Sequence, residues 1–313
     1  MKEITVFSGR AHPELAAEIC RHLNVPLSPS RLTRFANDCL EVQLQANCRE
    51  RDVFIVQPIC EPVQEHMMEL FLMCDAARGA SAARITAVMP FFAYARSDKK
   101  DAPRISIGAR LMADLLAASG ANRVLTMALH SPQVHGFFPL PVDHLHALYE
   151  LAEYFKKYDL SNAVAVSPDL GNAKETAAFA RRLGIGVAVA AKQRFADDKV
   201  VISSIIGDVT DKDVIVLDDE IAKGSTTLEL LKHLRAAKAR SVRIACTHGL
   251  FADGAAQRLS DQPDVLEIVC TNTVPVPPEK RGSKLTVLSI AKALADAIQR
   301  THDGESVSAL FHA

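Results

Sequence analysis

The chain has 313 residues, of which 49% are hydrophobic and 23% charged, so it is long enough for two globular domains and far from a disordered composition. Lysine and arginine total 36 against 37 aspartates and glutamates, giving a formal net charge of -1, and tryptophan is absent. This balance excludes a general basic excess of the kind that condenses on nucleic acid, and we expect no nucleic-acid partner.

Short β-branched runs alternate with segments of helical spacing along the first half. Strands are predicted at Ile4–Phe7, Val53–Gln57, Ile85–Met89 and Val124–Leu129, and helices at His12–Leu23, Pro62–Arg78 and Ser106–Ala118. The segment Phe138–Pro141 is rich in proline and is the best boundary signal in the chain. We therefore predict an N-terminal domain over residues 1–145 and a C-terminal domain over residues 146–313.

The second half repeats the same rhythm. Strands are predicted at Ala163–Val166, Val187–Ala190, Val214–Leu217, Val242–Thr247 and Val265–Val269, and helices at Leu145–Phe155, Lys174–Leu183, Thr226–Ala237 and Ser289–Arg300. A proline-rich loop at Pro275–Pro278 leads to a last strand and helix. The alternation predicts an α/β fold, with two similar domains whose largely parallel sheets are flanked by helices.

The cysteines indicate the cellular compartment. They are seven, an odd number without CxxC spacing, and several lie in apolar runs. Free thiols of a reducing compartment explain this better than disulfides or zinc ligands. The first residues carry no signal-peptide pattern, and no apolar run approaches the ~18 residues of a membrane span. We expect a cytoplasmic protein with no membrane partner.

An acidic pair followed by a turn of small residues carries the most chemistry. The apolar run Val214–Leu217 delivers Asp218 and Asp219 to the carboxyl end of a predicted strand, where ligands bind in open α/β sheets. The turn that follows opens a predicted helix, and its backbone N–H groups and hydroxyls suit a monophosphate, while adjacent acids can hold vicinal sugar hydroxyls. The alternative is a capped helix beside a solvated acid pair. The GxxxxGK[ST] spacing of a Walker A loop is absent.

This segment resembles the phosphoribosyl-binding signature of type I phosphoribosyltransferases and of ribose-phosphate pyrophosphokinases. Further segments are similar to the second family alone and follow its order along the chain: Phe7–Ala16, Val88–Lys100, Leu129–Phe138 (LHxxQxxGFF), Val166–Asp169 (SPD) and Glu305–Phe311 (SVSxLF). The resemblance implies transfer of the pyrophosphoryl group of Mg·ATP to the 1-hydroxyl of ribose 5-phosphate, with the type I phosphoribosyltransferase-like fold in both domains.

The resemblance also implies roles for individual residues. Asp218 and Asp219 face the 2- and 3-hydroxyls of ribose 5-phosphate, and the 5-phosphate site comprises Ala222, Lys223, Gly224, Ser225, Thr226 and Thr227. ATP is bound by Phe35, Asn37, Arg96, Ser97, Asp98, Lys99 and His130, with Lys100 in support. His130 and Asp169 correspond to ligands of Mg²⁺, a hard cation that bridges phosphate oxygens.

Catalysis is assigned to Lys192 and Arg194. In the family a Lys-x-Arg at this place lies on a mobile loop that closes over the reacting phosphates. Two cations there offset the negative charge that builds as the β-phosphorus is attacked and AMP leaves. The resemblance also implies a homo-oligomer built from dimers, such as a hexamer, in which a hairpin bearing Phe35 reaches a neighbour's active site.

The chain departs from the family's pattern at three places. Ala222 stands where an Asp is usual, with Lys223 and Ser225 replacing Thr and Gly; Asn37 and Cys39 replace two acids of the adenine segment; Ala93 and Ser97 replace Gly and Gln. These changes indicate a divergent subgroup. Two alternatives are a catalytically silent subunit that associates with active synthetases and a base phosphoribosyltransferase, which would not need the ATP loop Arg96–Lys100. Release of AMP that depends on ribose 5-phosphate separates the three.

Overall fold

The computed structural model describes residues 3–196 and 199–308, and for residues 192–201 only the backbone within that range. The chain divides into two compact units, residues 1–146, 273–275 and 290–313 forming unit 1 and residues 147–272 and 276–289 forming unit 2. The C-terminal helix therefore belongs to unit 1, whereas the sequence analysis placed it in the second domain. No helix among the described residues is long and apolar enough to cross a bilayer.

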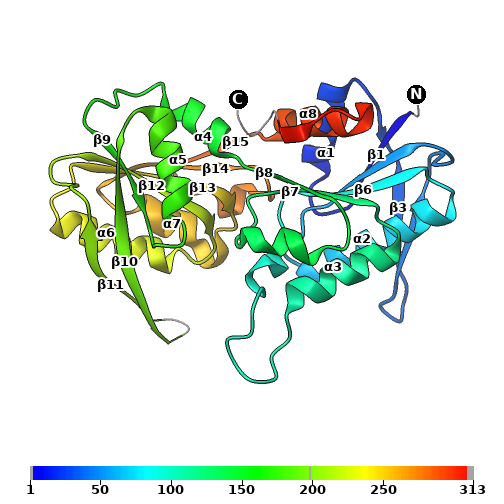
Figure 1. Cartoon of the computed structure of the whole chain (residues 1–313), viewed down its shortest axis with the longest axis horizontal. Coiled ribbons are helices and arrows are strands. Elements are labelled where there is room, and N and C mark those ends of the chain that lie inside the picture. Colours follow the sequence, from blue (N-terminus) through cyan, green and yellow to red (C-terminus); the bar gives the residue numbers. More distant parts are fainter. Residues whose placement is uncertain (1–2, 197–198, 309–313) are drawn as a thin grey trace. The chain divides into compact units, whose positions relative to one another are not determined.

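Unit 1 is built on a six-stranded parallel sheet in the order β2-β1-β5-β6-β7-β8, with a separate antiparallel hairpin, β3–β4. Helices α2 and α3 cover one face of the sheet, and α1 and α8 lie together on the other (Figure 1). The elements are β1 (Ile4–Ser8), α1 (Pro13–Leu23), β2 (Leu27–Ser28), β3 (Ser30–Arg34), β4 (Leu40–Leu44), β5 (Asp52–Val56), α2 (Val63–Gly79), β6 (Arg84–Met89), α3 (Gly108–Ser119), β7 (Arg123–Met127), β8 (Val142–Leu145) and α8 (Ala291–Asp303).

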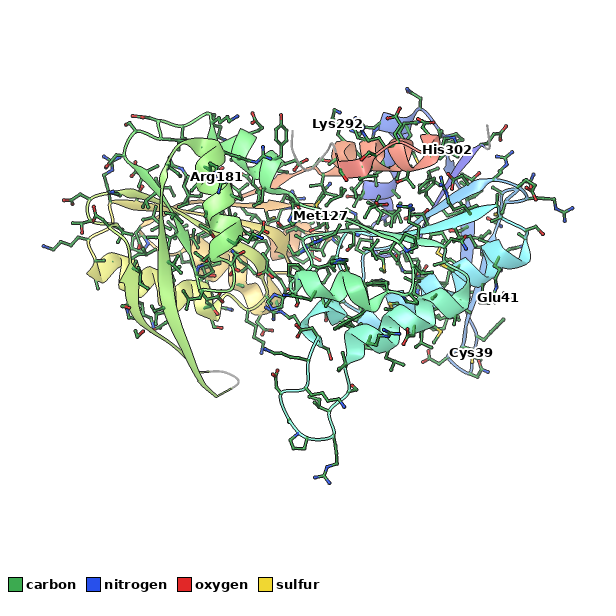
Figure 2. The ribbon with its side chains drawn as sticks, viewed as in Figure 1. Cys39, Glu41, Met127, Arg181, Lys292 and His302 are labelled. Carbon is green, nitrogen blue, oxygen red and sulfur yellow. The ribbon has the colours of Figure 1, made fainter. Side chains whose placement is uncertain are left out.

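Polar contacts fasten the C-terminal helix to the sheet of unit 1. Asp52, buried at the start of β5, accepts a 2.8 Å hydrogen bond from Arg84 Nε and lies 2.9 Å from His302 Nδ1. Arg84 also donates to the carbonyl of Thr301 at 2.9 Å. Figure 2 labels Lys292 and His302 at the two ends of α8. An amphipathic pattern in the sequence predicts such a helix, but the unit on which it packs depends on these contacts between distant residues.

Unit 2 has a seven-stranded sheet in the order β11-β10-β9-β12-β13-β14-β15, parallel except for the β10–β11 hairpin. Alternate residues of its strands face opposite layers: Ile215 and Leu217 pack with α4 and α5, and Val214 and Val216 with α6 and α7. The elements are α4 (Leu148–Phe155), β9 (Ala163–Ser167), α5 (Ala173–Leu183), β10 (Gly186–Ala196), β11 (Lys199–Ile206), β12 (Asp213–Ile221), α6 (Ser225–Ala236), β13 (Ser241–Gly249), α7 (Ala255–Ser260), β14 (Val265–Thr271) and β15 (Leu285–Leu288).

Candidate active site

The acidic pair lies at the carboxyl end of a central strand of unit 2. Val214–Leu217 are fully buried between β9 and β13, and Glu220 and Ile221 at the end of the strand are buried again, whereas Asp218 and Asp219 between them are half-buried. The backbone N–H of Asp219 donates to Asp218 Oδ1 at 3.0 Å, which orients the first carboxylate. The position matches the expectation from the apolar run that precedes the pair.

A third carboxylate lies close to this pair. Burial, and then the charges of Asp219 and Asp169, raise the pKa of Asp218 well above its ordinary value. Asp169 follows β9, and its Oδ1 accepts a 3.1 Å bond from the N–H of Asn172. The amide of Asn172 donates in turn to the carbonyl of Leu217 at 2.8 Å, so it ties the Asp169 turn to the end of β12. The sequence analysis did not single out Asn172; its place three residues after Asp169 was the available signal.

The small-residue turn connects β12 to α6. Gly224 adopts the left-handed region at φ 71°, and a Cβ there would lie 3.4 Å from that of Ala255 and 3.5 Å from Leu259 Cδ1, so a glycine suits both the backbone and the packing. Helix α6 begins at Ser225 without a side-chain capping bond from residue 224. Within this turn Ala222 and Thr226 are half-buried, Ser225 is exposed and Thr227 is buried. The first turn of a helix presents N–H groups and positive potential to an anion.

Lys223 projects from this turn into solvent, and its side chain is 69% exposed. Its Nζ lies 3.7 Å from Oδ2 of Asp253, a residue that is equally exposed. The carbonyl of Lys223 accepts a 2.7 Å bond from Arg258 Nη2. Both partners come from the segment after β13, and the sequence analysis identified neither.

The charged loop of unit 1, residues 96–100, follows β6, and hydrogen bonds of Ser97 connect it to the start of α3. Ser97 Oγ accepts the N–H of Gly108 at 2.9 Å, and the carbonyl of Ser97 accepts that of Ala109 at 3.1 Å. Ser97 thus fastens the loop to the start of α3. Arg96 and Lys99 are exposed, Asp98 is half-buried, and Lys99 Nζ lies 3.7 Å from Asp101.

His130 lies just beyond the carboxyl end of β7 and is exposed. The preceding N–H, of Leu129, donates to His144 Nε2 at 2.9 Å, which fixes the backbone beside His130. His130 belongs to unit 1 and Asp169 to unit 2, so the two expected metal ligands come from different units.

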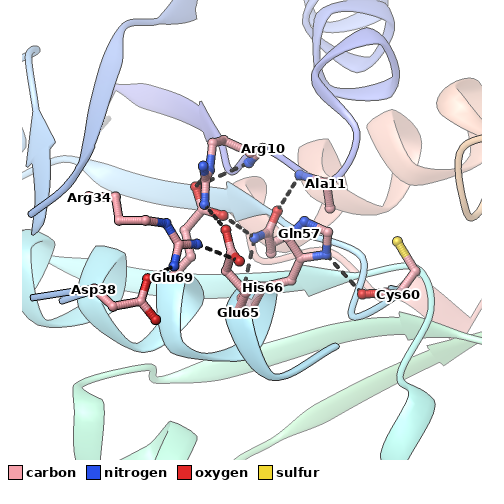
Figure 3. A network of polar contacts seen from close by, with 9 residues as sticks. All are labelled: Arg10, Ala11, Arg34, Asp38, Gln57, Cys60, Glu65, His66 and Glu69. Carbon is pink, nitrogen blue, oxygen red and sulfur yellow. Dashed lines mark hydrogen bonds and ion pairs between the residues drawn. The ribbon is translucent and has the colours of Figure 1, made fainter. Parts of the chain in front are cut away.

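Phe35 and Asn37 lie in the turn of the β3–β4 hairpin, the turn that also contains Cys39, which Figure 2 labels. Phe35 is 49% exposed, which is unusual for a large aromatic side chain, and Asn37 Oδ1 accepts the N–H of Cys39 at 3.2 Å. Figure 3 shows what holds the base of this turn: Arg34 contacts Glu65 on α2 at 2.6 Å, and Glu65 also pairs with Arg10. The arginine contact with Glu65 lowers the pKa of that carboxyl.

Lys192 and Arg194 have their backbone in strand β10, paired with Ile202 and Val200 of β11. The expected loop at this place is therefore wrong for the backbone, which forms a hairpin extending past Ala191. Their side chains lie outside the described part of the structure.

The arrangement of donors can be tested against a bound Mg²⁺. Within the described residues, no group of three or more His, Cys, Asp or Glu side chains is arranged so that it could hold a metal ion by itself. Asp169, Asp218 and Asp219 nevertheless repel one another, and a cation near them would relieve that repulsion. Such a site fits Mg²⁺, which commonly takes one or two carboxylates and completes its octahedron with water and phosphate oxygens.

Comparisons with known proteins agree across the whole chain. Residues 4–120 match the N-terminal domain of ribose phosphate pyrophosphokinase, and residues 193–312 match a phosphoribosyl synthetase-associated domain. The ribose-phosphate pyrophosphokinase of Deinococcus radiodurans is 49% identical over 313 residues, covering 98% of each chain, and that of Wolinella succinogenes is 40% identical over 311 residues, covering 99% of this chain and 100% of the relative. The crystal structure of phosphoribosylpyrophosphate synthetase from Mycobacterium smegmatis superposes with a TM-score of 0.91 at 39% identity, covering 97% of this chain and 100% of that one.

Proposed function

The chain belongs to the ribose-phosphate pyrophosphokinase family, and from this premise we propose that it transfers the pyrophosphoryl group of ATP to ribose 5-phosphate. The 1-hydroxyl oxygen of the sugar attacks the β-phosphorus. The bond from that phosphorus to the α,β-bridging oxygen breaks, AMP leaves with that oxygen, and the hydroxyl proton is released. The observation that carries the proposal is the half-buried carboxylate pair near the carboxyl end of β12, with the turn of residues 222–224 leading from that strand to the start of α6.

Ribose 5-phosphate binds to unit 2 in this proposal. The carboxylates of Asp218 and Asp219 accept hydrogen bonds from the 2- and 3-hydroxyls, and the 5-phosphate lies on the turn from Ala222 to Thr227. Burial and the neighbouring carboxylates make the charged form of Asp218 costly, which raises its pKa, and hydroxyl donors or a cation would reduce that cost. The site is therefore electrostatically suited to its ligand before the ligand arrives.

ATP binds to residues of unit 1 in this proposal. Arg96 and Lys99, exposed on the charged loop, contact the phosphates, and Asp98 supports them. Ser97 joins them as an ATP-binding residue and also holds the loop on α3, because its hydroxyl oxygen accepts the N–H of Gly108. Phe35 stacks on the base and Asn37 lies beside it; the 49% exposure of Phe35 supports a role in contact with a ligand.

The reaction needs positive charge around the transferred phosphoryl groups. Lys192 and Arg194 provide it in the transition state, where charge accumulates on the entering, leaving and equatorial oxygens. Asp169 and His130 would each serve as a ligand of Mg²⁺, which would neutralise phosphate oxygens of the nucleotide. The exposed hairpin bearing Phe35 supports a homo-oligomer in which that hairpin completes a neighbour's nucleotide site, and the free, mostly buried thiols support a cytoplasmic location.

The test is AMP formation from ATP with and without ribose 5-phosphate, together with calorimetric binding of the sugar. Replacing Asp218 and Asp219 together by Asn should weaken ribose 5-phosphate binding strongly. A matched control replaces Asp208 and Asp211, two exposed acids that precede the same strand, by Asn and should leave binding unchanged. AMP release that does not depend on ribose 5-phosphate, or equal affinity in both double variants, contradicts the proposal.

A further inference from the structure

We propose that Arg258 is a positioning residue that sets the backbone orientation of the phosphate-binding turn, residues 222–227. The inference rests on the proposed function, because it concerns the same turn. Arg258, on α7, directs its two terminal nitrogens to two backbone carbonyls: Nη2 donates to Lys223 at 2.7 Å, and Nη1 donates to Asp253. One guanidinium thus joins the turn after β12 to the turn after β13.

The contact between Arg258 and the carbonyl of Lys223 determines the direction of the backbone N–H of Gly224, which can donate a hydrogen bond to the 5-phosphate. In a trans peptide the carbonyl oxygen and the following N–H point in opposite directions. Holding the carbonyl of Lys223 toward Arg258 therefore directs the N–H of Gly224 away from Arg258. Gly224 follows at φ 71°, and a glycine has little steric barrier to rotating the adjoining peptide. Without a fixed carbonyl, this peptide would sample orientations that turn the N–H away from the phosphate.

The surrounding packing separates this role from one in the core. Ala255 and Leu259 of α7 are buried and support Gly224 from within, whereas Arg258 is exposed. Removing the guanidinium leaves the apolar support in place. The expected loss is therefore one of orientation in the turn and not of the fold of unit 2.

The pattern of acceptors also explains why an arginine is required. Two carbonyls on separate turns are reached by a planar group with several fixed N–H donors, whereas a lysine ammonium is a single point that cannot span both in the same way. Arg258→Lys keeps the positive charge but loses the simultaneous hydrogen bonds to the two carbonyls. It therefore distinguishes positioning from a simple attraction between Arg258 and the phosphate dianion.

The experiment compares wild type, Arg258→Lys and Arg258→Gln by calorimetric titration with ribose 5-phosphate and by initial rates of AMP release. We expect Arg258→Lys to raise the Kd and the KM for ribose 5-phosphate by about tenfold, the worth of one to two directed hydrogen bonds. The KM for ATP and the kcat at saturating sugar should change by less than about threefold. Added guanidinium ion should restore part of the affinity of Arg258→Gln. Arg235→Lys, which alters an exposed arginine paired with Asp264 in the same unit, is the matched control.

Each outcome decides between the possibilities. A wild-type affinity in Arg258→Lys would overturn the inference and leave the proposed function intact, and a loss in Arg258→Gln alone would mean that charge, not positioning, is what Arg258 supplies. Equal losses in kcat and in both KM values, with a lower melting temperature, would mean a merely structural role. Failure of the wild type to bind ribose 5-phosphate would overturn the proposed function together with this inference.

Discussion

Asp253 should compete with the substrate phosphate for the ammonium of Lys223. At 3.7 Å, opposite unit charges attract by about 1 kcal/mol in water, and both side chains are about two-thirds exposed. Exposed pairs typically retain ~0.2–1 kcal/mol once side-chain entropy is counted. Asp253→Asn frees Lys223 and removes a negative charge near the phosphate, so the KM for ribose 5-phosphate should fall by up to about fivefold. Lys223→Thr should instead raise it about five- to thirtyfold, the loss of ~1–2 kcal/mol from a charge-assisted contact.

The assay is the initial rate of AMP release with ribose 5-phosphate varied, at low salt and at about 0.15 M salt, where the Debye length is about 8 Å. Both effects should shrink as salt is raised, and the KM for ATP should stay constant. In the Lys223→Thr background, Asp253→Asn should have less effect than in the wild type, which measures the coupling directly. Asp261→Asn, the loss of another exposed acid from the segment after α7, is the control. Equal KM values for Lys223→Thr and wild type at low salt would refute the reasoning.

Three further changes test other parts of the site. Lys192→Ala should lower kcat by several orders of magnitude with nearly unchanged ribose 5-phosphate affinity, because its charge is needed chiefly in the transition state; a fall of less than about tenfold would contradict its catalytic role. Asp218→Asn should raise the melting temperature of the metal-free protein at pH 7, by about 2–4 °C for each kcal/mol of relieved repulsion, while weakening sugar binding. Since the folded pKa lies above the ordinary value, wild-type stability falls as pH rises through that pKa, and the two proteins should melt alike near pH 4; a constant difference would exclude the charge of Asp218 as its cause. Phe35→Ala and Lys192→Ala chains, each nearly inactive, should regain activity when mixed and allowed to exchange, and proven exchange without recovery would count against a shared nucleotide site.

The most predictable parts of the molecule are those where one local signal suffices. The apolar run Val214–Leu217 predicts a buried strand. The acids and small residues after it predict a carboxylate pair and a turn near the end of that strand. The hairpin β3–β4 was not predicted from periodicity: although β4 alternates in burial, the two strands form a separate two-stranded sheet in which no residue is fully buried. Strand β10 continues through Lys192 and Arg194, where the resemblance to the family had implied a loop.

Contacts between distant residues were beyond the reach of periodicity and motif. Nothing in the letters around Arg258 indicates that its guanidinium will meet the carbonyl of Lys223, 35 positions earlier. The pairing depends on β12 and β13 being neighbours in the sheet, which brings the turns after them together. The same holds for α8: the sequence pattern predicted a helix with an apolar face, but it did not indicate that this face packs on α1.

The position of α8 has a consequence for how the protein is made. All the strands described in unit 1 lie within the first 146 residues, yet the helix that packs on α1 and contacts Asp52 begins only at Ala291. A ribosome adding ~5–20 residues per second needs about 7–30 s to cover that interval. Throughout that time the nascent unit 1 exposes the surface of α1 that α8 will cover. Helix α8, which is synthesised after the strands of both units, therefore completes unit 1, and a ribosome that stops short of it releases a chain in which that surface of α1 is uncovered.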